Sequence, residues 1–165
     1  MSKKLELELL SILEEDAGLS CADMAKMLNV SEKEIADTKK ALEDKKAVLK
    51  YVALTNRENL EGDDRVEALI ELKVTPQREF GYDDIAKRIY RYSEVKSVYL
   101  MAGGYDLCVQ MESDNIKNIS KFVFEKLAVI DGVTSTQTVF IMRKYKDNGV
   151  VLVSGDQEER LVVTA

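Results

Sequence analysis

The segment from Val95 to Glu112 (VKSVYLMAGGYDLCVQME) most constrains the fold of this chain. It begins with an apolar run rich in β-forming residues. From Leu107 onwards, apolar and polar side chains alternate strictly, which is the period of a half-buried strand. Between the two parts lie Gly103 and Gly104, and paired glycines permit the positive φ angles that a tight hairpin requires. The segment therefore predicts a β-hairpin with a short, exposed turn.

The turn, Ala102-Gly103-Gly104-Tyr105-Asp106, places several polar groups at one edge of the hairpin. Its backbone N–H groups suit the carboxylate of a small zwitterion, and the carboxylate of Asp106 suits an ammonium group. The local sequence alone favours a simpler interpretation, in which the glycines shape the turn and Asp106 caps backbone N–H groups. The surrounding sequence has to decide between a ligand-binding turn and a purely structural one.

The residues before the hairpin predict an N-terminal domain of helices over residues 1–55. Apolar residues at helical spacing predict helices over 4–15, 21–28 and about 31–44, the last with Ile35, Ala36 and Leu42 facing inward. Ser20 and Ser31 are the expected N-caps, and Ser31 forms a capping box with Glu34. Short helices joined by a tight turn and preceded by another helix indicate a helix-turn-helix. The apolar run 48–54 predicts a strand, either the wing of a winged version or a bridge to the next domain.

The polar segment 56–64 is the expected linker, and residues 65–145 then give a regular order of elements. The pattern predicts strands at 65–75, 95–101, 107–112 and 133–142, and helices at 83–92 and 115–129, the first with Tyr90 on its apolar face and the second capped by Ser113 or Asp114. This is the ferredoxin-like βαββαβ order, in which two helices cover one face of a four-stranded antiparallel sheet. The predicted fold class is α+β, a (winged) helix-turn-helix followed by this sandwich domain.

Two further features predict contacts between subunits and additional strands after the sandwich domain. Apolar residues occur on both faces of the hairpin strands (Val98 and Tyr99, Leu100 and Met101), which indicates pairing between subunits. Residues 146–165 form a C-terminal extension, with 149–153 and 160–163 as two additional short strands.

Composition excludes several classes of function. The net charge of −6 argues against indiscriminate binding to nucleic acid, although it is compatible with a local basic face. Histidine is absent, which excludes a His-containing zinc site, a Ser-His-Asp triad and a Cys-His dyad. We therefore expect no enzyme, no metal and no cofactor. The two distant cysteines, the lack of a signal peptide and the lack of a membrane-length apolar stretch predict a cytoplasmic protein that does not associate with membranes.

A helix-turn-helix, a bridging strand and a βαββαβ domain with Gly-Gly-Tyr-Asp between its central strands resemble the Lrp/AsnC family. These are the feast/famine transcriptional regulators of bacteria and archaea. The resemblance covers residues 1 to about 145 and is sharpest over 95–109, where the family typically shows valine, a variable stretch and Gly-x-Tyr-Asp. It implies a regulator that binds operator DNA. It also implies that the C-terminal domain binds an amino acid or similar small molecule and forms homodimers, which commonly assemble as tetramers of dimers into octamers.

The resemblance also implies roles for particular positions. It assigns effector binding to Gly103, Gly104, Tyr105, Asp106, Thr134, Ser135 and Thr136, and DNA contacts to Ser31, Lys33, Thr38, Lys39, Lys40 and Lys46. The third helix departs from the family pattern, because Asp37 and Thr38 stand where arginines are expected. An acidic residue near phosphates is repulsive. This departure keeps open a second hypothesis, a ligand-binding and assembly protein that has lost sequence-specific DNA binding. A third hypothesis, an enzyme like the sirohaem decarboxylases that resemble this family, is weak because that branch relies on histidine.

Overall fold

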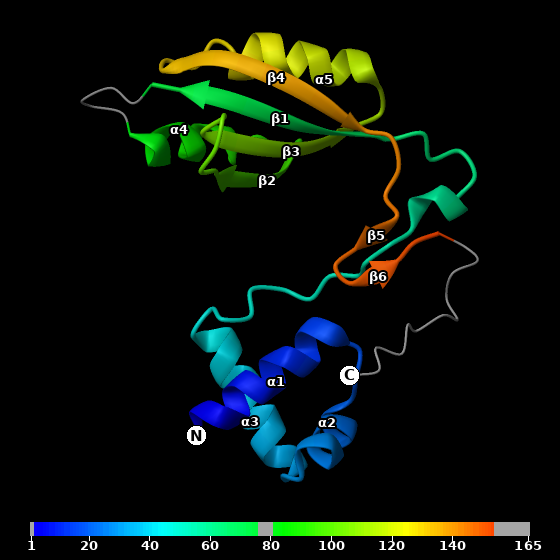
Figure 1. Cartoon of the computed structure of the whole chain (residues 1–165). Coiled ribbons are helices and arrows are strands. Elements are labelled where there is room, and N and C mark those ends of the chain that lie inside the picture. The colour runs from blue at the N-terminus through cyan, green and yellow to red at the C-terminus, as the bar shows by residue number, and fades with distance from the viewer. Residues whose placement is uncertain (1, 76–80, 154–165) are drawn as a thin grey trace, which may run out of the picture. The chain divides into compact units, whose positions relative to one another are not determined.

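The computed structural model describes residues 2–75 and 81–153, and the chain divides into two compact units, Met1–Thr55 and Asn56–Ala165. Figure 1 shows helices alone in the first unit and a sheet with helices in the second. The expected added strand at 160–163 lies outside the described residues. No helix in the described part of the chain has the length and apolar character needed to cross a membrane.

The first unit consists of α1 (Lys3–Glu15), α2 (Cys21–Leu28) and α3 (Glu32–Asp44) around a small apolar core. Its fully or almost fully buried side chains are Leu9, Met24, Ile35 and Leu42, whereas Ala36 is exposed and not inward-facing as predicted. Asn29 ends α2 in the left-handed conformation, and the capping box of Ser31 and Glu34 begins α3 two residues later. These local signals produce the tight turn between α2 and α3.

The predicted strand over 48–54 is not formed in the described structure, where this segment pairs with no other. Leu49 and Val52 are 81% and 70% exposed. A strand is stable only when another strand satisfies its backbone groups, and the single chain offers none here. Two residues of the segment do pack on the helical unit. Val48 is half-buried against its core. The Tyr51 hydroxyl donates to Glu43 at 2.8 Å, and the Lys39 ammonium lies 4.6 Å from the Tyr51 ring centroid. Burial, with help from Glu43, raises the pKa of Tyr51 to about 12.

The second unit confirms the predicted ferredoxin-like order. Its elements are β1 (Val66–Val74), α4 (Tyr82–Ile89), β2 (Val95–Leu100), β3 (Leu107–Ser113), α5 (Ile116–Phe122) and β4 (Val133–Ile141). The antiparallel sheet has the order β2-β3-β1-β4. Both helices contribute to the single core of this unit, so they cover the same face of the sheet (Figure 1). A short helix, η1 (Arg57–Asn59), precedes β1.

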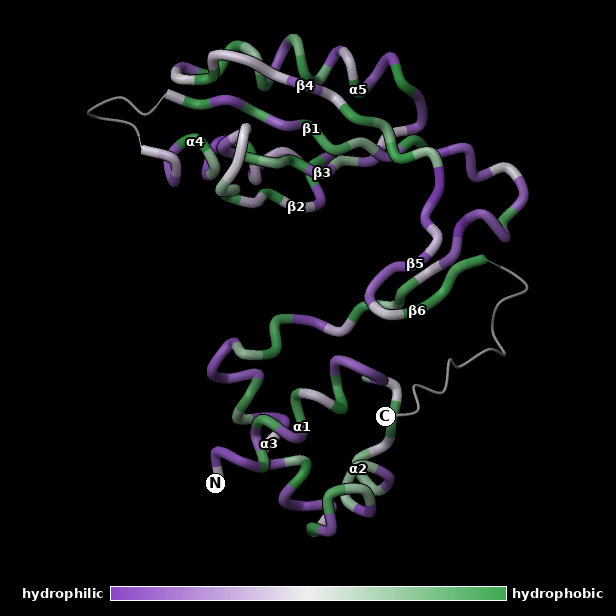
Figure 2. Tube along the Cα trace, viewed as in Figure 1, coloured by the Kyte–Doolittle hydropathy of each residue, from purple (hydrophilic) through white to green (hydrophobic). Residues whose placement is uncertain are grey.

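The alternation of side chains along β1 sets the register of the sheet. Ala68, Ile70, Leu72 and Val74 are buried. The residues between them are less buried, and two of these, Glu71 and Lys73, belong to the hydrophilic part of β1 in Figure 2. Leu72 pairs with Leu107 of β3 on one side and with Thr136 of β4 on the other. This register places the turn between β2 and β3 beside the end of β1 and the first half of β4.

The two helices of this unit differ from the predictions in capping, pitch and length. The helix over 115–129 is capped by Asn115, not by Ser113 or Asp114, because the Asn115 side chain accepts from the Asn118 N–H at 2.9 Å. It also changes pitch, since α5 continues as a π-helix, η2 (Val123–Leu127). The helix predicted over 83–92 ends at Ile89 and leaves Tyr90 58% exposed.

The described part of the C-terminal extension forms a small hairpin of its own. Strand β5 (Lys146–Asp147) pairs with β6 (Val150–Val151) around Asn148 and Gly149, both of which have positive φ. The expected strand at 149–153 is thus shorter than predicted and takes β5 as its partner.

Gly132 is the position in the second unit where a side chain should cost most. It has φ +92°, and an added Cβ would lie 3.1 Å from Ile85 Cδ1 and 3.2 Å from the Thr75 carbonyl oxygen. Gly132→Ala should lower the free energy of unfolding by about 2–4 kcal/mol, because left-handed strain and overpacking add. Urea denaturation followed by circular dichroism measures this. Gly62→Ala is the matched control, since Gly62 has φ +81° with nothing within 4 Å, and equal losses for the two variants would contradict the account.

Candidate functional site

The residues between β2 and β3 form an exposed loop that is closed at its base and tied to β1. The Met101 N–H donates to the Asp106 carbonyl at 2.8 Å, and the Asp106 N–H donates to the Leu72 carbonyl at 2.9 Å. Gly103 and Gly104 do not adopt positive φ, so the predicted reason for the glycine pair was wrong. A six-residue connection reverses the chain gradually and needs no left-handed residue. An added Cβ would meet nothing within 4 Å at either glycine, which leaves this backbone open to approach from outside.

Asp106 holds the loop to the end of β1. Its carboxylate accepts from the Val74 N–H at 2.8 Å and pairs with the Lys73 ammonium at 3.3 Å. The Val74 hydrogen bond, with smaller help from Lys73 and Tyr82, holds the pKa of the Asp106 carboxyl below its usual range. This geometry matches the simpler interpretation, in which Asp106 caps a backbone N–H.

The loop is also joined to β4, which carries the other predicted effector residues. The Tyr105 hydroxyl donates to Gln137 Oε1 at 2.7 Å, and the Thr134 hydroxyl donates to the Lys73 carbonyl at 3.2 Å. Ser135 is exposed and pairs with Lys73, and the neighbouring Thr136 is half-buried. The structure thus gathers the predicted residues of the loop and of β4 around the end of β1.

Lys73, Val74, Tyr82 and Gln137 belong to this cluster and were missed by the sequence analysis. The available signal was the βαββαβ order itself, which places the end of the first strand beside the central hairpin turn and the start of the last strand. Counting the alternation along β1 would have identified Lys73 as a neighbour of the turn.

The loop presents backbone donors that the single chain does not use. The N–H groups of Ala102, Gly103 and Gly104 make no hydrogen bond with any described residue, and all three residues are exposed. Successive free N–H groups attract anions. This arrangement can bind a small carboxylate. Within residues 2–75 and 81–153, no group of three or more Cys, Asp or Glu side chains is placed to hold a metal ion.

Helix α3 presents a mixed surface. Lys33 and Lys40 lie two turns apart on one side, are exposed, and make no ion pair with any described residue. Asp37 lies between them on the same side and is also exposed. Lys39 is held over Tyr51, and Lys46 follows the helix with φ +57°. Ser31 is engaged in the capping box, whose backbone and hydroxyl hydrogen bonds lower the pKa of Glu34.

Thr38 does not lie on this surface, and its predicted contact with DNA was wrong. Its exposed fraction is 0%, because helical spacing places it on the buried stripe with Ile35 and Leu42. Its hydroxyl makes no hydrogen bond with any residue that the structure describes. The family resemblance placed Thr38 on the DNA-facing surface, but in this structure it belongs to the core of the helical unit.

The fold and these two surfaces define a class: a helix-turn-helix unit joined to an α+β unit with a candidate small-molecule loop. The family model of the Lrp/AsnC ligand binding domain matches residues 67–151. The uncharacterized HTH-type transcriptional regulator YugG of Bacillus subtilis (strain 168) is 40% identical over 159 residues, which is 96% of each chain. The chain belongs to the Lrp/AsnC family of transcriptional regulators and carries the ligand-binding domain of that family, which confirms the predicted family.

Solved structures agree with the fold. The transcriptional regulator NMB0573 from Neisseria meningitidis, in complex with L-Met, has a TM-score of 0.71 and 23% identity, covering 89% of this chain and 94% of that one. The feast or famine regulatory protein Rv3291c from M. tuberculosis, complexed with L-methionine, has a TM-score of 0.72 and 17% identity, covering 92% and 99%.

The lowered pKa of Asp106 predicts a specific acid response. A carboxylate whose folded pKa lies below its unfolded value of about 3.9 stabilises the fold above that value, and this contribution is lost as the pH falls through the folded pKa. As the pH falls below the unfolded value, the wild-type protein should therefore lose stability more steeply than Asp106→Asn. Urea midpoints measured across this range test it. Asp114→Asn is the charge-matched control at the opposite end of the sheet, and an unchanged slope in Asp106→Asn would refute the assignment.

The orphaned hydroxyl predicts that Thr38 is not optimal for stability. Thr38→Val replaces the hydroxyl by a methyl group of similar size and should raise the free energy of unfolding by about 1 kcal/mol, since an unsatisfied buried polar group costs about 1–3 kcal/mol. Thr38→Ser keeps the hydroxyl, loses the methyl group and should destabilise by about 1 kcal/mol. Denaturant titrations of both variants check the opposite signs, and a destabilised Thr38→Val would disprove the claim.

Proposed function

We propose that this protein is a cytoplasmic DNA-binding transcriptional regulator whose second unit binds an amino acid or a similar small metabolite. The binding site is the loop 101–106 with the adjoining part of β4. The observation that carries the proposal is the row of free N–H groups at Ala102, Gly103 and Gly104, on a loop held in place by Asp106. The two similar structures that contain L-methionine support an amino acid as the first ligand to try.

The ligand's carboxylate binds the free N–H groups, because charge-assisted hydrogen bonds to consecutive amides are strong. The empty space above both glycines lets it approach the backbone closely. Its ammonium group is directed to Asp106, where it competes with Lys73 for the carboxylate. Thr134, Ser135 and Thr136 on β4 supply polar side chains at the border of the site.

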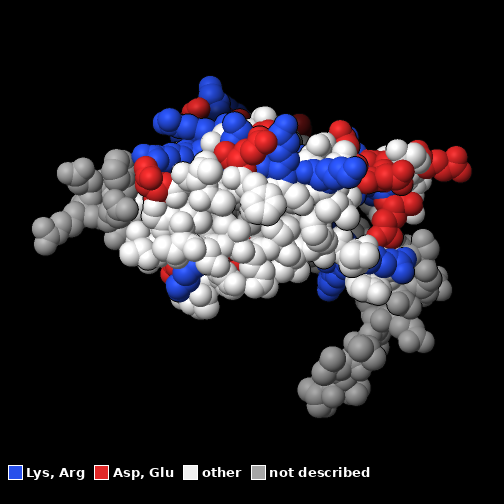
Figure 3. Space-filling model, turned by 90° about the horizontal axis from the view of Figure 1, so that it is seen from above, with Lys and Arg blue, Asp and Glu red and all other residues white. Residues whose placement is uncertain are grey.

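Oligomerisation completes the site and links it to DNA. Three successive large apolar residues are exposed where β2 enters the loop: Tyr99 by 50%, Leu100 by 64% and Met101 by 49%. Contiguous exposed apolar surface of this kind is typical of an interface with another protein chain. Figure 3 shows a broad area without charged side chains on the side of the sheet where β4 forms the edge. Edge strands without charge are templates for pairing. We propose homodimers that assemble into octamers, with ligand binding favouring one assembly over another.

In this mechanism α3 enters the major groove and a dimer joins two half-site contacts. Ser31, Lys33, Lys39, Lys40 and Lys46 are the proposed contacts, of which Lys33 and Lys40 are the most available. One observation favours a second function, assembly without DNA recognition: Asp37 lies between these two lysines and repels phosphate. The two functions differ in whether operator DNA is retained.

The ligand site is tested by calorimetry with L-methionine and then with the other common amino acids. We expect saturable binding that Asp106→Asn weakens at least tenfold, about 1.4 kcal/mol. Asp114→Asn, the same change at the far end of the sheet, should bind as the wild type does. No heat with any amino acid, or equal affinity in Asp106→Asn, would overturn the site.

DNA binding is tested by gel shift on the region upstream of the protein's own gene. We expect specific retention that is lost in Lys33→Glu plus Lys40→Glu. Asp37→Asn should tighten binding about three- to tenfold, because a removed repulsion of about 1 kcal/mol is typical of exposed charges. The control is Glu14→Gln, which also removes one negative charge but lies on α1, and it should change DNA affinity less. Failure of the wild type to retain DNA at low salt would favour the assembly function.

A further inference from the structure

Glu71 differs from the other half-buried carboxylates of this chain because no described residue neutralises it. It lies on β1, is half-buried, and its carboxylate makes no hydrogen bond or ion pair with any residue that the structure describes. Every other half-buried carboxylate in residues 2–75 and 81–153 has a lysine or arginine within 3.5 Å. A partly desolvated charge without a counter-charge is unfavourable. Glu71 is therefore a candidate for contact with a cation from outside the chain.

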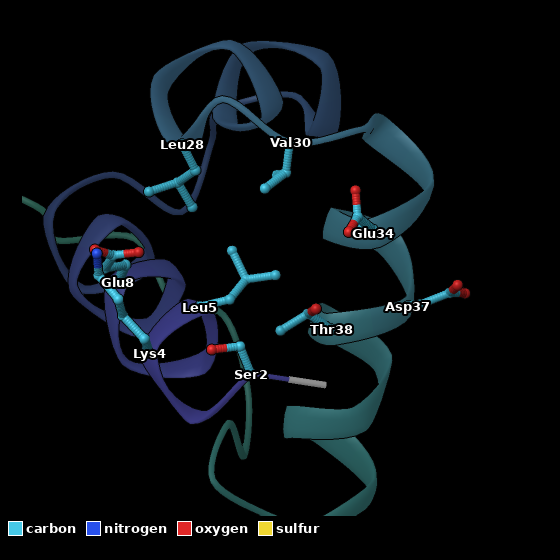
Figure 4. Close-up of a pocket in the computed structure, with 9 residues that line it drawn as sticks. All are labelled: Ser2, Lys4, Leu5, Glu8, Leu28, Val30, Glu34, Asp37 and Thr38. Atoms are coloured by element: carbon cyan, nitrogen blue, oxygen red, sulfur yellow. The ribbon is translucent and has the colours of Figure 1, made fainter.

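The carboxylates beside a groove of the helical unit, between α1 and α3, are in a different situation (Figure 4). Glu8 pairs with Lys4 at 3.6 Å, and Glu34 accepts the hydrogen bonds of the capping box. Asp37 extends away from the groove in Figure 4 and is exposed, so water solvates it. None of these three carboxylates is both half-buried and unpaired, as Glu71 is.

Glu71 lies on the open face of the sheet, which is the face opposite α4 and α5. Its neighbours Ile70 and Leu72 are buried in the core that these helices cover, so Glu71 faces the other way. On the open face it stands between Cys108 of β3 and Gln137 of β4, and these three residues form one row across the strands. Burial, with help from the Glu71 carboxylate, raises the pKa of the Cys108 thiol, an electrostatic effect that requires the two groups to be close.

The next row of the open face contains the ion pair of Lys73 and Asp106, which belongs to the proposed amino-acid site. Side chains on one face repeat every two residues, and an antiparallel strand rises about 3.4 Å per residue, so this row lies about 7 Å from Glu71. Tyr105 joins the two rows, because its hydroxyl donates to Gln137 at 2.7 Å. Together the rows contain two carboxylates and one ammonium group, an excess of one negative charge.

We propose that Glu71 selects an amino acid with a cationic side chain, such as lysine, at the proposed ligand site. This inference rests on the proposed function, in which the loop 101–106 binds the α-carboxylate and Asp106 binds the α-ammonium group. The two amino groups of an extended lysine lie about 7 Å apart, given bonds of about 1.5 Å, which matches the spacing of the two rows. The net positive charge of lysine balances the excess negative charge of the rows. An aliphatic or thioether side chain has no donor for Glu71 and would cover an unpaired charge.

Calorimetry of the full chain with L-lysine and L-norleucine tests the role of Glu71, because norleucine has the same carbon skeleton without the terminal ammonium group. We expect the wild type to bind lysine at least tenfold more tightly than norleucine. Glu71→Gln should weaken lysine at least tenfold and change norleucine less than threefold. Glu112→Gln is the matched control on the same face. It lies about 14 Å along the strands from the Glu71 row, beyond the screening length of about 8 Å at physiological salt, and should keep the preference for lysine.

A ligand variant tests the same contact on the wild type and does not depend on the folding of a mutant. Nε-acetyl-L-lysine keeps the chain but loses the charge, and it should bind at least tenfold less tightly than lysine. Equal affinity of the wild type for lysine and norleucine, or a lysine preference retained by a folded Glu71→Gln, would overturn the role of Glu71 and leave amino-acid binding at the loop intact. Absence of binding by lysine, norleucine and methionine alike would overturn the proposed function, and this inference with it.

Discussion

The hydrogen bond from the Val74 N–H to the Asp106 carboxylate is the contact on which the proposed sensing site depends. It joins a loop of the central hairpin to the end of β1, and through β1 to β4. The Asp106 N–H also donates to the Leu72 carbonyl, so two hydrogen bonds of Asp106 hold the loop on β1. The N–H groups of Gly103 and Gly104 make no hydrogen bond within the described part of the chain, and both residues are exposed. Because the loop is already held on β1, binding a carboxylate should cost it little conformational entropy.

The helical unit shows a different balance between fold and function. Its core is small, and one of its interior positions is a threonine, Thr38, whose hydroxyl has no hydrogen-bond partner among the residues that the structure describes. The surface of α3 sets Asp37 between Lys33 and Lys40, so electrostatic attraction to DNA is weaker than a purely basic helix would give. Such a helix gains from joining two copies in a dimer.

Much of this structure follows from local patterns in the sequence. The alternation in β1 and β3 predicted these two strands, and the capping box at Ser31 predicted the start of α3, because these signals are local. The 48–54 segment was predicted as a strand from its apolar residues, but a strand also requires a partner that one chain does not contain. Thr38 was assigned to DNA by family position, whereas helical spacing from Ile35 and Leu42 would have placed it in the core. The glycine pair was assigned a positive φ because the loop was taken to be shorter than it is.

The central claim is that the loop N–H groups receive a ligand carboxylate, and amide NMR measures this most directly. The ¹⁵N-labelled full chain should be titrated with L-methionine, and the amide signals of residues 102–104 followed. The account predicts saturable downfield proton shifts at Gly103 and Gly104, with smaller changes at Lys73 as its pairing to Asp106 is contested. Saturable binding that leaves both glycine amides unmoved and shifts residues elsewhere would contradict it.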